Sequence, residues 1–198
     1  MLENRHLSQN PRRLAAAVIS AAALAACTAC GGADGTGARQ TMMGTSSTTQ
    51  LQPLGTAEMS PKTQRPSAPA QLIVTGVRVG THEGFDRVVV DLEGQGEPGW
   101  FVDYTSTPMQ ETTGQPLQVA GNAFLNINVD GTVTPYEVGK DIQATVEKAG
   151  DTGNVVDVVN AGTSQGRSQV VVGLRSELPY SVQVLDEPTR LVVDIVQN

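Results

Sequence analysis

Cys27 stands where bacterial export pathways attach lipid to a protein. It follows an apolar run over residues 14–26, whose last members are small, and Arg12 and Arg13 precede that run. A helix needs about 20 residues to cross a bilayer core, so this run is too short to be a permanent span. We therefore predict a cleaved lipoprotein signal peptide over residues 1–26. Acyl chains on the sulfur and the freed amine of Cys27 would hold the chain to the extracytoplasmic side of the cell membrane.

Two other interpretations of this segment stay open. Cleavage after Ala25, at an Ala-x-Ala pattern that begins at Ala23, would release the protein without lipid. Cys27 and Cys30 also form a Cys-x-x-Cys pair, which is typical of redox or metal sites. No further Cys follows them, and the residues around them are not those of a strand and a helix. Lipid attachment at Cys27 is the interpretation that we favour.

His82 is the only histidine after residue 26, and Glu83 follows it directly. A histidine oriented by a third group is the base that activates a serine or threonine in hydrolases, so this pair could in principle serve such chemistry. A hydrogen-bonded residue of a turn is the interpretation that we favour. One His and no Cys after residue 30 do not readily supply the three or four ligands of a zinc site. We expect no metal, no cofactor and no enzyme activity.

Trp100 and Tyr104 are four residues apart, so they share one side of a strand. Aromatic rings on a sheet face can stack on sugar rings, which would suit a glycan-binding protein. In a chain with so few aromatic residues such rings are more often part of the core. Both residues remain candidates for a binding face.

Four charged residues occupy alternating positions in two valine-rich segments. Arg87 and Asp91 are in the first segment, and Arg190 and Asp194 are in the second. Alternate residues of a strand point to opposite faces, so the aliphatic residues between these charges face the core and the charges face outwards. At ~3.3 Å per residue the two charges of each strand lie about 13 Å apart. They are candidates for binding a ligand or partner, with weak ion pairing inside the sheet as the alternative.

The elements that position these residues follow a long segment without apolar periodicity. Residues 27–70 are rich in Gly, Ser, Thr, Gln and Pro, so we predict a disordered tether. Its last forty residues would span about 35 Å. Without residues 1–26 the chain keeps 10 basic and 19 acidic residues, a net charge of −9. This acidity argues against nucleic acid as a partner.

Residues 71–198 contain an internal repeat. Residues 80–92 align with residues 162–174 at an offset of 82, with seven identical positions. Each copy continues as four short segments with strand character, near 72–79, 86–93, 100–104 and 123–129 in the first copy and near 154–161, 168–174, 180–185 and 190–196 in the second. We predict an all-β fold, a β-sandwich of two roughly symmetric four-stranded sheets made by duplication.

Two stretches do not follow the repeat. Residues 140–149 fit either a helix or a strand. The insertion at residues 109–122 has no counterpart in the second copy and could cover an edge or part of a face. Gln169 and Gly173 also stand where the first copy has Arg87 and Asp91, so the two faces cannot bind identically.

Two motifs in this region resemble a known family. Residues 77–92 read VRVGTHEGFDRVVVDL and residues 188–195 read PTRLVVDI. Both are similar to the AMIN-like domain of actinobacterial envelope lipoproteins, and the similarity covers residues 72–197. That family is similar to the AMIN domain of cell-wall amidases and pilus secretins. The resemblance implies a β-sandwich with motifs on its outer faces and, by analogy, a domain that binds peptidoglycan and localises its host protein without catalysis.

We therefore expect a lipid-anchored, non-enzymatic envelope protein that binds peptidoglycan or another wall polymer. The alternative is a protein-interaction module that recruits or regulates a cell-wall hydrolase or a secretion complex. Net acidity slightly favours the alternative, because anionic wall polymers would repel an acidic chain. His82, Trp100 and Tyr104 join the four outward charges as candidates for the binding face.

Overall fold

The computed structural model describes residues 50–148 and 153–197, so Cys27 and the predicted signal peptide lie outside the described residues. The described part is all-β, with one short 3₁₀ helix, η1 (Pro135–Val138). The strands are β1 (Lys62–Gln64), β2 (Ser67–His82), β3 (Phe85–Glu97), β4 (Gly99–Thr105), β5 (Ala123–Asp130), β6 (Thr145–Lys148), β7 (Val155–Ser164), β8 (Arg167–Leu174), β9 (Tyr180–Leu185) and β10 (Arg190–Val196). No helix among these residues is long and apolar enough to cross a membrane.

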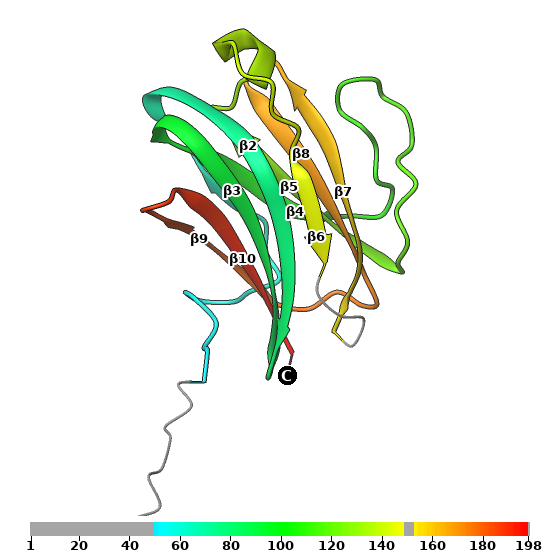
Figure 1. The fold of residues 1–198 in the computed structure, drawn as a ribbon. Helices are drawn as coiled ribbons and strands as arrows, with labels where there is room; N and C mark the ends of the chain where they lie inside the picture. Colours follow the sequence, from blue (N-terminus) through cyan, green and yellow to red (C-terminus); the bar gives the residue numbers. More distant parts are fainter. Residues whose placement is uncertain (1–49, 149–152, 198) are drawn as a thin grey trace, which may run out of the picture. The chain divides into compact units, whose positions relative to one another are not determined.

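The strands form two five-stranded sheets that pack face to face around one core (Figure 1). Sheet A has the order β6-β2-β3-β10-β9, and sheet B has the order β1-β4-β5-β8-β7. Neighbouring strands are antiparallel, except that β6 runs parallel to β2.

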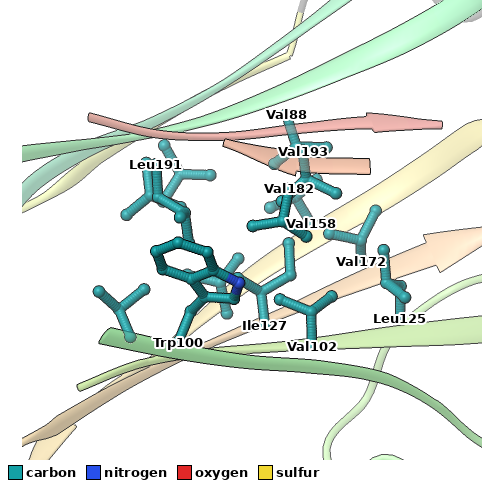
Figure 2. Packing of buried hydrophobic residues seen from close by; sticks show 14 of the residues in the cluster. Val88, Trp100, Val102, Leu125, Ile127, Val158, Val172, Val182, Leu191 and Val193 are labelled. Atoms are coloured by element: carbon teal, nitrogen blue, oxygen red, sulfur yellow. The ribbon is translucent and has the colours of Figure 1, made fainter. Parts of the chain in front are cut away.

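The predicted inward faces are confirmed. From sheet A, Val88, Val90, Leu191 and Val193 have no exposed surface, and side chains of sheet B meet them across the sandwich (Figure 2). Full burial of such aliphatic side chains contributes about 1.5–3 kcal/mol each to folding. The alternation of aliphatic and other residues along a strand therefore identifies the face that packs in the core, and the opposite face is the one available for binding.

Each sheet joins the first hairpin of one repeat to the last two strands of the other. Sheet A contains β2 and β3 next to β10 and β9, and sheet B contains β7 and β8 next to β5 and β4. Exchanging the two repeats therefore maps one sheet onto the other. The two hairpins share a register at their turns, and Gly84 and Gly166, at equivalent turn positions, both have φ of 83°, a left-handed conformation that favours glycine.

The sheets differ from the prediction by one strand each. β6 lies within residues 140–149 and extends sheet A, so the strand interpretation holds for residues 145–148. β1 extends sheet B by pairing with β4. β1 and the start of β2 belong to the segment that we expected to be a disordered tether, and for residues 50–70 that expectation is wrong. β1 joins the fold through backbone pairing at a sheet edge, and residues 52–54 bind polar side chains of sheet A through their backbone, so neither contact requires apolar periodicity in the sequence.

Candidate functional site

The centre of the outer face of sheet A is a buried ion pair. Arg87 on β3 and Asp194 on β10 are cross-strand neighbours. The Nε and Nη2 atoms of Arg87 donate to the two carboxylate oxygens of Asp194 at 2.7 and 2.8 Å. The Asp194 side chain is fully buried, and that of Arg87 is only 16% exposed. Two parallel charged hydrogen bonds fix the orientation of both groups, and loss of either partner would leave a buried charge uncompensated.

The other two predicted residues of this face are not paired with each other. Asp91 accepts two hydrogen bonds of 2.6 Å from Nε and Nη2 of Arg78 on β2. The hydrogen bond to Asp91 raises the pKa of Arg78. Arg190 lies opposite Asp91 in the ladder, but its Nη1 donates to the carbonyl oxygen of Pro188 at 2.8 Å. The four predicted charges therefore share one face, without forming one cluster.

Residues 52–58, which we call the strap, cover the central ion pair. The amide of Leu54 donates to Asp194 Oδ2 at 2.6 Å, and Arg87 Nη2 also donates to the carbonyl oxygen of Gln52 at 3.2 Å. Ser181 Oγ on β9 donates to the carbonyl oxygen of Leu54. The prediction that Asp194 is open to solvent is therefore wrong. Asp194 does lie on the outer face, but the strap and its neighbours bury it.

The same face carries a hollow of about 490 Å³. It is lined by residues of β2, β3 and β6, namely Arg78, Val79, Gly80, His82, Arg87, Val89 and Glu147. Most of the surface of this hollow is apolar, and charged and hydrogen-bonding side chains share its lining. This arrangement suits a ligand that combines an apolar surface with polar groups.

His82 is the last residue of β2 and pairs with Phe85, so it lies beside the two-residue turn at residues 83–84 and the expectation that it belongs to the turn is wrong. Its ring lies 4.8 Å from the ring of Phe85, centroid to centroid, with the planes tilted by 32°. Among the hydrogen bonds of the described residues, none joins His82 to Glu83 or to a hydroxyl group. The oriented base that a hydrolase needs is not formed in this geometry.

Trp100 and Tyr104 belong to the core, so their candidacy for the binding face is wrong. Trp100 is 7% exposed and points between the sheets towards Leu191 (Figure 2). The hydroxyl of Tyr104 donates to the carbonyl oxygen of Leu178 at 2.7 Å and accepts from its amide at 3.0 Å. Burial raises the pKa of Tyr104 and also that of Tyr180, whose ring packs edge-on against it. Spacing placed the two residues on one side of β4, and that side faces inwards.

The outer face of sheet B has an uncharged pair at the equivalent place. Gln169 on β8 and Asn128 on β5 are cross-strand neighbours, 5% and 1% exposed. The insertion at residues 109–122 covers them. Gln169 Nε2 donates to the carbonyl oxygen of Met109 at 2.8 Å, and Gln169 Oε1 accepts from the amide of Glu111 at 3.0 Å. Asn128 Nδ2 donates to Glu111 Oε1 at 2.8 Å. The two faces are therefore closed by different segments and differ in charge.

Sequence reasoning missed Arg78, Glu111 and Asn128 as parts of these faces. Asn128 carries a visible signal, because a polar residue alternates with aliphatic ones along β5. Arg78 carries the same signal, because it lies between Val77 and Val79 on β2. Glu111 carries none, since it lies in the insertion and in no strand. Within residues 50–148 and 153–197 no group of His, Cys, Asp and Glu side chains is arranged to hold a metal ion.

The sequence model of the AMIN-like domain matches residues 72–197. The matched region contains both repeats, from β2 to β10, and leaves out the strap. No curated protein and no solved structure matches the chain.

Proposed function

The chain belongs to the AMIN-like domain family, and from this premise we propose that it is a lipid-anchored, non-enzymatic binding protein associated with the cell wall. In this proposal Cys27 anchors it on the extracytoplasmic side of the cell membrane. The sandwich then binds peptidoglycan or another wall polymer through the outer face of sheet A.

The hollow on sheet A is the observation that carries this proposal. Arg78 is half exposed there, so its remaining N–H groups can reach a ligand that carries carboxylate or hydroxyl oxygens. His82 and Glu147 add further polar groups to the lining. On sheet B the insertion lies over the equivalent polar pair. The strap covers the central pair of sheet A in the same way, and sheet B has a hollow of about 230 Å³ beside Arg167 and Asp130, so what distinguishes sheet A is its larger hollow of about 490 Å³.

Sedimentation with purified sacculi tests the proposed face. Arg78→Ala is expected to weaken the affinity for sacculi at least about tenfold, and so to lower the bound fraction, which is the effect of losing one charged hydrogen bond. Arg167→Ala is the matched control, because Arg167 is a half-exposed arginine on the outer face of sheet B whose Nε lies 2.6 Å from Asp130. Its bound fraction should stay that of the wild type. If both variants bind sacculi as well as the wild type does, or if both lose binding to the same extent, the choice of sheet A is contradicted.

Metabolic labelling with radioactive palmitate tests the anchor. Cys27→Ala should abolish the label and release the protein from the membrane fraction, whereas Cys30→Ala should keep both. The reverse pattern would move the lipid to Cys30, and label in neither wild type nor variants would remove the anchor from the proposal.

A second candidate function is a protein-interaction module that recruits or regulates a wall-acting enzyme or a secretion complex. The burial of Trp100 and Tyr104 favours it, because these rings are not available to stack on sugars. The formal net charge of −7 favours it too, since it opposes binding to anionic polymers. Crosslinking in cells would support it if one protein is captured and glycan digestion does not release that protein.

A further inference from the structure

On sheet A, the central ion pair holds a piece of peptide backbone. Arg87 donates to the carbonyl oxygen of Gln52, and Asp194 accepts from the amide of Leu54. The contact therefore takes the carbonyl of one residue and the N–H of the residue two positions later. In an extended chain these two groups point to the same side.

Sheet B repeats this contact with different residues. Gln169, which stands at the position of Arg87 in the second repeat, donates to the carbonyl oxygen of Met109 and accepts from the amide of Glu111. The bound groups are again the carbonyl of one residue and the amide of the residue two positions later. Two unrelated segments of the chain thus bind at equivalent places through the same backbone groups. On the outer face of each repeat, the bound groups are therefore peptide backbone groups.

The two bound segments are not held equally firmly. The insertion on sheet B continues into strands at both ends and is fixed by further bonds, among them Gln110 Nε2 to the carbonyl oxygen of Ala161 at 2.9 Å and the amide of Ala120 to Asp157 at 2.8 Å. The strap on sheet A contacts the ion pair only through residues 52 and 54. Its other attachments are Ser181 Oγ, which donates to the carbonyl oxygen of Leu54, and Glu58, which pairs with β9, and its residues 52–57 belong to no strand. The strap is therefore the segment that another peptide can replace.

We propose that the Arg87–Asp194 pair is a docking site for an extended segment of a partner polypeptide, which the strap occupies in the free protein. The partner segment presents a free carbonyl, a free N–H two residues later, and an apolar side chain at that second residue, as half-buried Leu54 does. A polysaccharide chain does not repeat this pair of groups at peptide spacing. The inference rests on the proposed binding role of sheet A. It deepens the second candidate function, the protein-interaction module, because it names the chemistry of the partner.

A labelled peptide with the sequence of residues 50–58, QLQPLGTAE, is the probe, and the full chain is the receptor. Leu54→Pro removes the N–H that occupies Asp194, so this variant should bind the peptide at least about tenfold more tightly than the wild type does, by fluorescence polarisation. Thr56→Pro is the matched control, because the amide of Thr56 makes no hydrogen bond within the described residues. It should bind the peptide as weakly as the wild type.

Backbone methylation of the probe makes the test independent of how well the Leu54→Pro variant folds. N-methylation at the leucine that corresponds to Leu54 should abolish binding, and N-methylation at the threonine that corresponds to Thr56 should not. The same difference is expected with the wild-type chain at higher peptide concentration. Equal affinity of the two methylated probes, or of the two proline variants, overturns the proposal.

Peptide-free glycan strands separate this inference from the wall-polymer function. If these strands bind the Leu54→Pro variant and the peptide does not, the face is a glycan site, so the peptide proposal is overturned and the wall-polymer function stands. If the peptide binds and sacculi do not sediment the chain, the peptide proposal stands and the wall-polymer function fails.

Discussion

Two ion pairs on one sheet face give a prediction that depends on how far each pair is covered. Arg87–Asp194 and Arg78–Asp91 both consist of two parallel N–H···O bonds of 2.6–2.8 Å. The side chains of the first pair are 16% and 0% exposed, and those of the second are 50% and 25% exposed. The hydrogen bonds within the two pairs have the same geometry, so the pairs should differ in strength because only the first is buried and bound by the strap.

The expected stabilities follow from that difference. Asp194→Ala leaves the guanidinium of Arg87 largely buried without its partner and should lower the free energy of unfolding by about 3 kcal/mol, near the low end for buried pairs because Arg87 keeps some exposure. In a double-mutant cycle the Arg87–Asp194 coupling should be about 2 kcal/mol. Asp91→Ala should cost no more than about 1 kcal/mol, and the coupling of Arg78 to Asp91 should be about 0.5 kcal/mol.

Urea unfolding of the single and double variants at low and high salt is the assay. Between about 0.01 M and about 1 M salt the screening length falls from about 30 Å to about 3 Å. The coupling of the exposed Arg78–Asp91 pair should vanish at high salt, and that of the buried Arg87–Asp194 pair should persist. Equal couplings at low salt, or an equal loss in both pairs, would refute the argument that the strap and the sheet shield the central pair.

Three further outcomes follow from the core and the second face. Trp100→Ala should cost about 3–5 kcal/mol in urea unfolding, and Tyr136→Ala, at a residue 90% exposed, should stay within about 0.5 kcal/mol of the wild type. Gln169→Ala should cost about 1–3 kcal/mol and speed limited proteolysis within residues 109–122, because it frees the insertion. Burial raises the pKa of Tyr104 and Tyr180 above 10.0, so the stability that these two residues contribute should be complete below about pH 10 and be lost above it.

Each of these three predictions has a result that would contradict it. A small effect of Trp100→Ala would return that residue to the candidate binding face. An unchanged cleavage rate in Gln169→Ala would mean that other contacts hold the insertion. A stability that rises through pH 10, or an equally steep fall in Tyr104→Phe, would contradict the assigned cause of the alkaline loss.

Local patterns predicted the parts of this fold that depend on local chemistry. The alternation around Val88 and Val90 identified the inner face, because a strand with one buried face must repeat every two residues. The repeat of residues 80–92 at 162–174 predicted the two equivalent hairpins. The same rule placed Arg87 and Asp194 on an outer face. It could not show that Asp194 is buried, since the covering amide of Leu54 lies 140 residues away in sequence.

The unpredicted parts all depend on long-range or backbone contacts. β1 is three residues long and pairs at a sheet edge, so it needs no apolar pattern. Trp100 and Tyr104 were correctly assigned to one side of a strand, but the side was decided by how β4 packs against sheet A. The contact of Gln169 with the insertion spans about sixty residues and leaves no motif.

Chemical-shift mapping with the isotopically labelled full chain tests the central claim, binding at the outer face of sheet A, most directly. The added ligand would be soluble fragments from digested sacculi. Binding at this face should shift the amide signals of Arg78, His82 and Glu147 and leave those of Glu111 and Arg167 on the sheet B side unchanged. Shifts confined to Glu111 and Arg167, or no shifts at saturating fragment concentration, would contradict the account.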